Sequence, residues 1–67
     1  MHRDLDRLVA EMVEKGIHYA DAVREFERRF LAHALKASAG SITRCAALTG
    51  IHRNTLTRKI AEHQLKG

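Results

Sequence analysis

The chain has no proline, and three of its four glycines divide it into segments in which apolar residues recur every three or four positions. This spacing places apolar side chains on one face of an α-helix, whereas a half-buried strand needs strict alternation. A proline-free chain rich in alanine, leucine, arginine and glutamate also argues against a turn-rich β-sandwich or barrel. The sequence therefore predicts an all-α fold.

Four helices are expected, over residues 5–15, 19–39, 42–49 and 53–63. Gly16, Gly40 and Gly50 are the expected stops, because glycine tolerates the left-handed conformation that commonly ends a helix. Ser41 is the expected N-cap of the third helix, since its side chain can accept a hydrogen bond from a free backbone N–H. These boundaries leave no room for a second domain, a linker or a repeat.

The predicted second helix is apolar over a wider arc than one contact requires. Its main stripe is formed by Tyr19, Val23, Phe26, Phe30, Ala34 and Ala37. Leu31 and Leu35 lie off this stripe, towards a second face. A chain of 67 residues rarely builds a core worth more than about 3–5 kcal/mol by itself. We therefore expect this helix to contact both the rest of its own chain and a second subunit.

Charge is divided unevenly along the chain. Residues 1–35 contain six basic and seven acidic residues, whereas residues 36–67 contain six basic residues and a single acid, Glu62. No acidic residue lies between Glu27 and Glu62. A surface that only needs to be soluble would intersperse both signs. The second half is therefore predicted to meet a polyanion.

The second half also has the layout of a helix-turn-helix motif, in which a short helix and a recognition helix are joined by a tight turn. Ala46 is small enough to let the two helices cross closely. Gly50 takes the turn, and Ile51 fills the angle between the helices. Thr49 is a departure from the ideal pattern, because an apolar residue is commoner at its position.

A specific resemblance begins at residues 40–47, GSITRCAA, and at residues 50–60, GIHRNTLTRKI. Both stretches resemble the Fis-type DNA-binding domain, which is found in the nucleoid protein Fis and at the C-terminus of NtrC-like enhancer-binding activators. Residues 26–35 are similar to the preceding helix of that family. The resemblance covers residues 19–67 and is strongest over residues 40–60.

The resemblance implies a four-helix Fis-like subunit that forms one domain over residues 1–67. Residues 1–39 would form an intertwined homodimer core with a second copy, and residues 40–67 would form the DNA reader. The expected interface residues are Leu8, Met12, Val23, Phe26 and Phe30. Paired recognition helices would enter successive major grooves of double-stranded DNA and bend it, which adds sequence preference through deformability. Transcription regulation is the function that this implies.

Two features of the wider family are not expected here. Fis carries a β-hairpin arm ahead of its helices, and four residues before Leu5 cannot supply one. NtrC-like activators carry an ATPase domain, and this chain has no glycine-rich nucleotide-binding loop. Recombination and ATP-driven activation are therefore not expected of this chain itself. Both a stand-alone regulator and a piece of a larger one, with other domains as partners, fit the sequence.

The start of the last helix is expected to read bases. The family pattern favours His52 and Arg53, and an arginine there could bind guanine through two hydrogen bonds. A helical wheel exposes Asn54 on the face opposite the buried one. Thr57 completes the predicted base-reading set, at a position where Fis has another arginine.

Phosphate binding is expected from Ser41, Thr43, Arg44, Thr55, Arg58 and Lys59. Thr43 and Arg44 lie in the first turn of the third helix, where free N–H groups and the helix dipole favour an anion. Contacts of this kind fix the register of a protein on DNA and make its affinity depend on salt, while specifying little sequence.

A zinc or catalytic site built from Cys45, His52 and His63 is not expected. Zinc needs three or four ligands with matched geometry, and His52 faces the groove side at a helix start. Cys45 lies on the packing side of a short helix, where a buried small apolar role fits better. We therefore predict no catalytic residue, no metal, no cofactor and no enzymatic activity.

No apolar run approaches the roughly 20 residues needed to cross a bilayer, and the chain lacks the tryptophan typical of membrane-surface helices. The single cysteine fits a reducing compartment. We therefore expect no membrane partner and a cytoplasmic, nucleoid-associated location. The remaining alternative is a helical dimerisation or protein-interaction module of a larger regulator, whose basic half docks an acidic protein.

Overall fold

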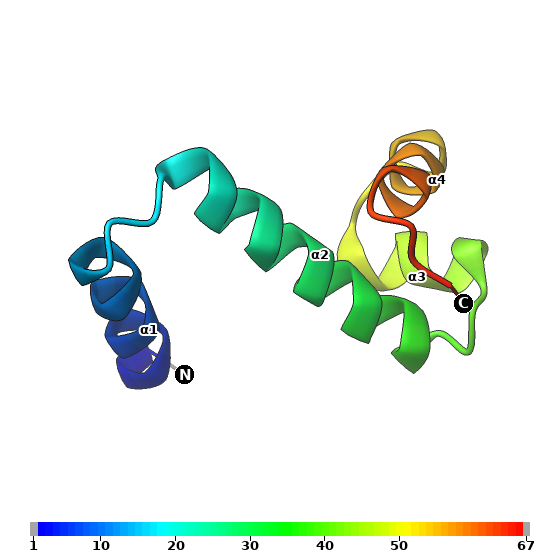
Figure 1. The fold of residues 1–67 in the computed structure, drawn as a ribbon. Coiled ribbons are helices and arrows are strands. Elements are labelled where there is room, and N and C mark those ends of the chain that lie inside the picture. The colour runs from blue at the N-terminus through cyan, green and yellow to red at the C-terminus, as the bar shows by residue number, and fades with distance from the viewer. Residues whose placement is uncertain (1, 67) are drawn as a thin grey trace.

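The computed structural model describes residues 2–66, and this part of the chain forms four α-helices and no strand (Figure 1). The helices are α1 (His2–Glu14), α2 (Tyr19–Ala37), α3 (Ile42–Thr49) and α4 (Arg53–Glu62). The long helix α2 is central, with α1 at its N-terminal end and with α3 and α4 beside its C-terminal half. The all-α prediction is confirmed, and α3 has the predicted bounds. The first helix begins three residues before the predicted start, and α4 ends one residue before the predicted end.

The end of α2 was predicted wrongly, because the helix stops at Ala37 and not at residue 39. The buried hydroxyl of Ser38 donates to a backbone carbonyl oxygen one turn back, at 2.8 Å. Ala39 then adopts a φ of 52°, and the N–H of Gly40 donates to the carbonyl oxygen of Leu35 at 3.0 Å. The left-handed turn therefore begins one residue before the glycine that was expected to supply it.

Replacing Ala39 with glycine is expected to stabilise the fold by up to about 1 kcal/mol. The left-handed conformation costs a residue with a β-carbon roughly 1–2 kcal/mol, and glycine avoids this cost. Because glycine loses more backbone entropy on folding than alanine does, the net stabilisation is smaller than the strain removed. Thermal unfolding at a fixed protein concentration should show a raised midpoint. In the matched control, Ala37→Gly should lower the midpoint, because Ala37 is helical. A lowered midpoint for Ala39→Gly would contradict the expected strain at this residue.

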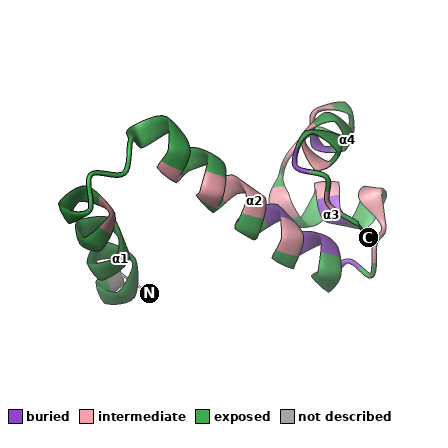
Figure 2. Cartoon of the chain, in the orientation of Figure 1, coloured by how far each residue is buried: buried purple, intermediate pink, exposed green. Residues whose placement is uncertain are grey.

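The buried core lies between the second half of α2, α3 and α4 (Figure 2). Its buried side chains are Leu31, Ala34, Leu35, Cys45 and Leu56. Partly buried apolar residues packed around them are Ile42, Ala46, Ile51, Ile60 and Leu65. Leu31 and Leu35 come from the face that the helical wheel separated from the main stripe of α2. The prediction that α2 contacts the rest of its own chain is therefore confirmed, and the helix-turn-helix has a core of its own.

Apart from the buried Ala34, the main stripe of α2 stays exposed within the described chain, and so does most of the apolar face of α1. Phe26 is 59% exposed, Phe30 is 48% exposed, and Val13 of α1 is 72% exposed. Apolar residues of α1, α2 and α3 line a groove of about 1260 Å³ between them. The fold thus combines a helix-turn-helix that covers its own core with two helices whose apolar faces remain open.

Candidate nucleic-acid interface

The turn between α3 and α4 is held by backbone and hydroxyl hydrogen bonds. Gly50 has a φ of 77°, and its N–H donates to the carbonyl oxygen of Ala46 at 2.9 Å. The hydroxyl of Thr49 donates to the carbonyl oxygen of Cys45 at 2.8 Å and accepts from the N–H of Ile51 at 3.3 Å. Thr49 therefore ties the end of α3 to the turn, which explains a polar residue where an apolar one is commoner.

Side chains cap both helices of the motif. Ser41 Oγ accepts from the N–H of Arg44 at 3.2 Å, so the predicted N-cap of α3 is confirmed. His52 caps α4, because its Nδ1 accepts from the N–H of Asn54 at 3.1 Å. An imidazole whose Nδ1 accepts carries its proton on Nε2. His52 therefore presents Nε2–H as the group that can donate to a base edge.

The predicted base-reading residues His52, Arg53, Asn54 and Thr57 are all exposed at the start of α4. The first three are consecutive, running from the cap into the first turn. The hydroxyl of Thr57 donates to the carbonyl oxygen of Arg53 at 3.0 Å, which leaves that hydroxyl as an acceptor only. Within residues 2–66 no acidic side chain forms an ion pair with Arg53. Its guanidinium is therefore available to an external acceptor.

Most of the predicted phosphate-binding residues are placed where they can reach solvent. Thr43 and Arg44 are exposed in the first turn of α3, whereas Ser41 and Thr55 are half-buried. Arg58 is 67% exposed at its side chain, and its Nη1 lies 3.8 Å from a carboxylate oxygen of Glu62. An exposed pair of that length contributes little and is easily exchanged for another anion.

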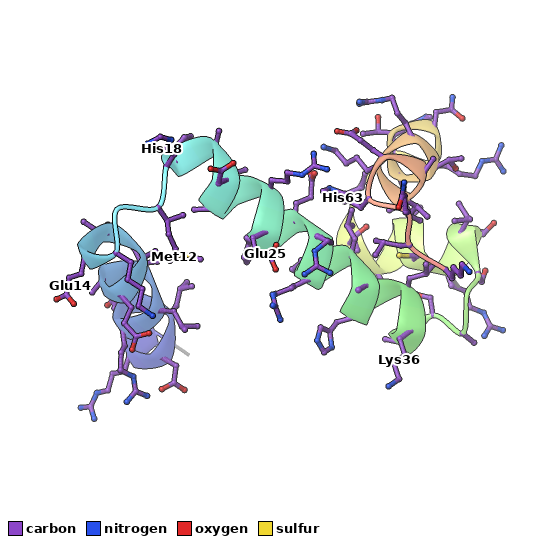
Figure 3. All side chains as sticks on the ribbon, viewed as in Figure 1. Met12, Glu14, His18, Glu25, Lys36 and His63 are labelled. Carbon is purple, nitrogen blue, oxygen red and sulfur yellow. The ribbon has the colours of Figure 1, made fainter. Side chains whose placement is uncertain are left out.

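Lys59 differs from the other predicted phosphate-binding residues. Its Nζ lies 2.6 Å from Oε1 of Glu27 in α2, and its side chain is 27% exposed. His63, which follows α4 (Figure 3), places its Nε2 2.7 Å from the second oxygen of the same carboxylate, and its side chain is 1% exposed. The hydrogen bonds from His63 and then from Lys59 hold the pKa of Glu27 below its ordinary value. The ammonium of Lys59 is therefore engaged in a half-buried ion pair with another helix of the same chain.

The cluster of Glu27, Lys59 and His63 was not predicted, although the sequence contains a signal for it. One face of α4 is formed by Leu56, Lys59, Ile60 and His63, at the i, i+3, i+4, i+7 spacing of a packed stripe. Glu27 precedes the buried Leu31 by one helical turn, so it lies on the core-facing side of α2. Lys59 was predicted to bind phosphate, and the structure places it on this packed face with its ammonium paired to Glu27.

Acid is expected to destabilise the fold through Glu27. A carboxyl whose pKa is lowered by folding stabilises the folded state above its ordinary value of 4.5, and this contribution disappears as the pH falls through the folded pKa. Wild-type protein should therefore exceed Glu27→Gln in thermal midpoint near neutral pH, with a difference that shrinks below about pH 4.5. Unfolding measured between about pH 7 and pH 3 gives this difference directly. A difference that is independent of pH would contradict the expected role of the charged carboxylate.

Cys45 is fully buried in the core and packs there as a small apolar side chain. Among residues 2–66 no group of three or more histidine, cysteine, aspartate and glutamate side chains is placed to hold a metal ion. None of the described helices combines the length and the apolar character needed to span a membrane.

Comparison with known families gives a match over residues 22–63 to the bacterial regulatory proteins of the Fis family. The matched segment contains most of α2, both helices of the motif and the turn between them. No curated protein and no solved structure matches the chain. The family match covers more than half of the 67 residues, so the resemblance inferred from residues 40–60 is confirmed. The chain belongs to the Fis family of bacterial regulatory proteins and carries its helix-turn-helix DNA-binding domain.

Proposed function

We propose that this chain binds double-stranded DNA with sequence preference as a homodimer, and that it regulates transcription and bends the DNA it binds. Membership of a family of DNA-binding regulators supports the first part of this proposal. The strongest structural support for DNA binding is the exposed, capped start of α4, where His52, Arg53 and Asn54 are accessible to a ligand. An α-helix fits the major groove, and its N-terminal residues then meet the base edges.

The charge around α4 fits this arrangement. Arg44 at the start of α3 and Arg58 in α4 are both exposed, and no acidic residue occurs between Glu27 and Glu62. Thr43 and the N-terminal N–H groups of α3 add neutral donors to the same set. These groups can bind phosphates on either side of a groove and hold the recognition helix in register. Residues 40–67 are therefore proposed as the DNA reader.

The dimer is proposed from the apolar surface that the chain leaves open. Of the five interface residues predicted from the sequence, Met12 is half-buried and the other four are exposed, namely Leu8, Val23, Phe26 and Phe30. All five line the groove between α1 and α2. A soluble monomer rarely exposes so continuous an apolar surface. Residues 1–39 of a second copy carry the same apolar helices, and mutual insertion would cover both copies at once.

The test of DNA binding begins with a selection of bound sites from random duplex DNA. Binding of a selected and a scrambled duplex is then measured by fluorescence anisotropy across a salt series. We expect tighter binding to the selected duplex and a steep, linear fall of log affinity with log salt, because bound phosphates release counterions. Absence of binding to any duplex near physiological salt would overturn the proposal. Retention on an immobilised acidic protein in that case would favour an interaction module instead.

A further inference from the structure

Glu27 makes the connection between the dimer-forming helix and the recognition helix. Of the ion pairs within residues 2–66, the two that join different helices or their flanking residues are both made by this carboxylate. Its partners, Lys59 and His63, lie 32 and 36 residues away in the chain. All other ion pairs in the described chain are local, between residues three or four apart.

The geometry of this contact restrains α4 at two points. Each oxygen of the Glu27 carboxylate takes one partner, Oε1 the ammonium of Lys59 and Oε2 the Nε2 of His63. The two partners are one helical turn apart along the packed face of α4. A carboxylate held at both oxygens by groups one turn apart restrains both the rotation and the tilt of the helix.

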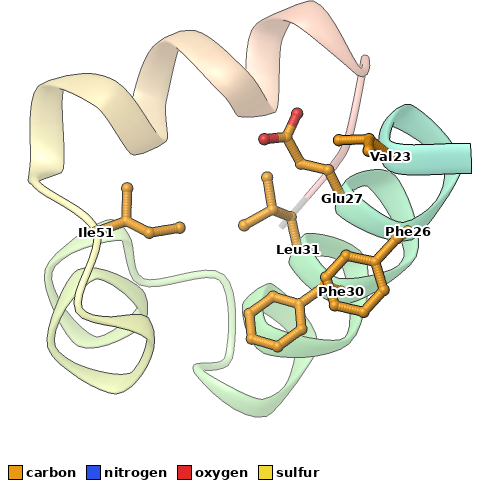
Figure 4. Close-up of a pocket in the computed structure, with 6 residues that line it drawn as sticks. All are labelled: Val23, Phe26, Glu27, Phe30, Leu31 and Ile51. Atoms are coloured by element: carbon orange, nitrogen blue, oxygen red, sulfur yellow. The ribbon is translucent and has the colours of Figure 1, made fainter. Parts of the chain in front are cut away.

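Apolar packing joins α2 and α4 through the core that both helices share with α3. Helix α3 packs closely against both α2 and α4, whereas α2 and α4 approach each other at few positions. Glu27 also lines an open apolar pocket of about 330 Å³, and the other lining residues come from α2 and from the turn before α4: Val23, Phe26, Phe30, Leu31 and Ile51 (Figure 4). The Glu27 carboxylate therefore adds a polar contact of fixed geometry to the apolar core that contains Leu31 of α2 and Leu56 of α4.

The burial of His63 shows that the contact is built into the fold. Its imidazole is 1% exposed, and its second ring nitrogen, Nδ1, has no hydrogen-bond partner among the described residues. An unsatisfied buried nitrogen carries a free-energy cost. The bond of Nε2 to Glu27 is thus the polar contact that compensates for placing this ring inside the protein.

From this arrangement we infer that Glu27 is a positioning residue for DNA recognition, and that Lys59 is its counter-ion and does not bind a DNA phosphate. The inference rests on the proposed function. Helix α2 carries Phe26 and Phe30 in the proposed dimer interface, while Glu27 holds α4 from the same turns of α2. The contact therefore transmits the geometry of the dimer to the recognition helices and fixes the spacing between the two half-sites that the dimer selects.

The first test concerns Lys59 and uses the dependence of affinity on salt. Each phosphate contact adds about 0.9 to the slope of log affinity against log salt. The double variant Glu27→Gln with Lys59→Gln keeps the net charge of the wild type. We expect its slope to equal the wild-type slope, whereas Arg58→Gln, the neighbouring exposed base, should lower the slope by about 0.9 per subunit. A decrease of about 0.9 per subunit in the double variant would overturn the assignment of Lys59.

The second test concerns positioning and uses the spacing between half-sites. Sites are selected from random duplex DNA with wild type, with Glu27→Gln and with Asp21→Asn. The Asp21 variant is a matched control, because it also removes one acidic charge from α2, at an exposed position that does not line the groove and forms no ion pair within the described residues. Wild type and the control should select one spacing, while Glu27→Gln should select a broader range with an unchanged salt slope. Equal spacing preference in all three proteins would overturn the positioning role.

A measurement without DNA separates this inference from the proposed function. In free protein, Glu27→Gln should make amide exchange at the end of α4 faster by on the order of tenfold, and Asp21→Asn should not. The N–H of His63, which donates to the carbonyl oxygen of Lys59 at 2.9 Å, reports on that turn. Unchanged exchange in Glu27→Gln would overturn the inference even if DNA binds. If no duplex binds wild type, the proposed function fails, and with it the assigned purpose of the contact.

Discussion

Replacing Phe30 with aspartate is expected to unfold the protein and not to release a folded monomer. Phe30 is half exposed in one copy and packs against Phe26, with ring centroids 5.6 Å apart in the groove of α1 and α2. In the proposed dimer this side chain becomes part of the shared core, where an unpaired carboxylate costs several kcal/mol. The described residues of one copy include five buried apolar side chains, too few to compensate for such a loss. The far-UV helical signal of the variant should be largely lost at micromolar concentration.

The measurement that supports this prediction is thermal unfolding of wild type over a wide range of protein concentration. An obligate dimer has a midpoint that rises with concentration, because association and folding are one equilibrium. Arg24→Asp is the matched control, since Arg24 is an exposed residue of α2 that does not line the groove. This control should remain folded and dimeric. An obligate dimer would be contradicted if Phe30→Asp were helical with a monomeric mass. It would also be contradicted if the thermal midpoint of the wild type did not depend on protein concentration.

The fold could be predicted to the extent that it depends on local signals. Helix α3 begins after Ser41 and ends before Gly50. Both boundaries could be predicted because an N-cap hydroxyl and a left-handed glycine act on backbone groups only a few residues away. The predicted end of α2 was wrong because helix propensity does not indicate that the Ser38 hydroxyl bonds a backbone carbonyl or that Ala39 adopts a left-handed conformation. A buried hydroxyl bond and the surrounding packing offset the strain at Ala39, and neither is visible in a propensity scale.

The candidate site shows the same division between local and distant causes. Helical periodicity predicts the exposure of Asn54, which is exposed, whereas Arg53 was expected to read bases from the family pattern and is exposed at the first position of α4. The pairing of Lys59 with Glu27 joins residues 32 apart, and its formation depends on how α2 crosses the motif. Counting charges along the chain cannot distinguish a lysine that pairs with a half-buried carboxylate from a lysine that faces solvent. Placing each charge on the packed or the open face of its helix makes that distinction.

Arg53→Ala is expected to remove most of the preference of the protein for its selected site. Arg53 is exposed at the first position of α4, pairs with no acid in the described chain, and follows the capping His52. A guanidinium there can bind O6 and N7 of guanine together, a contact worth about 1–3 kcal/mol of discrimination in each half-site. In a symmetric dimer the substitution acts twice, so the affinity ratio between selected and scrambled duplexes should fall by at least about tenfold.

Arg53→Lys separates the reading of bases from the attraction of charge. Lysine keeps the positive charge but lacks the planar pair of donors that matches guanine. This variant should therefore keep affinity for the scrambled duplex and the wild-type salt slope, while losing most of the discrimination that Arg53→Ala loses. Anisotropy titrations of both variants on both duplexes across the salt series give all of these quantities. If both variants retained the wild-type affinity ratio, base reading would have to lie elsewhere on α4, and Asn54, the next exposed residue, would be the position to replace first.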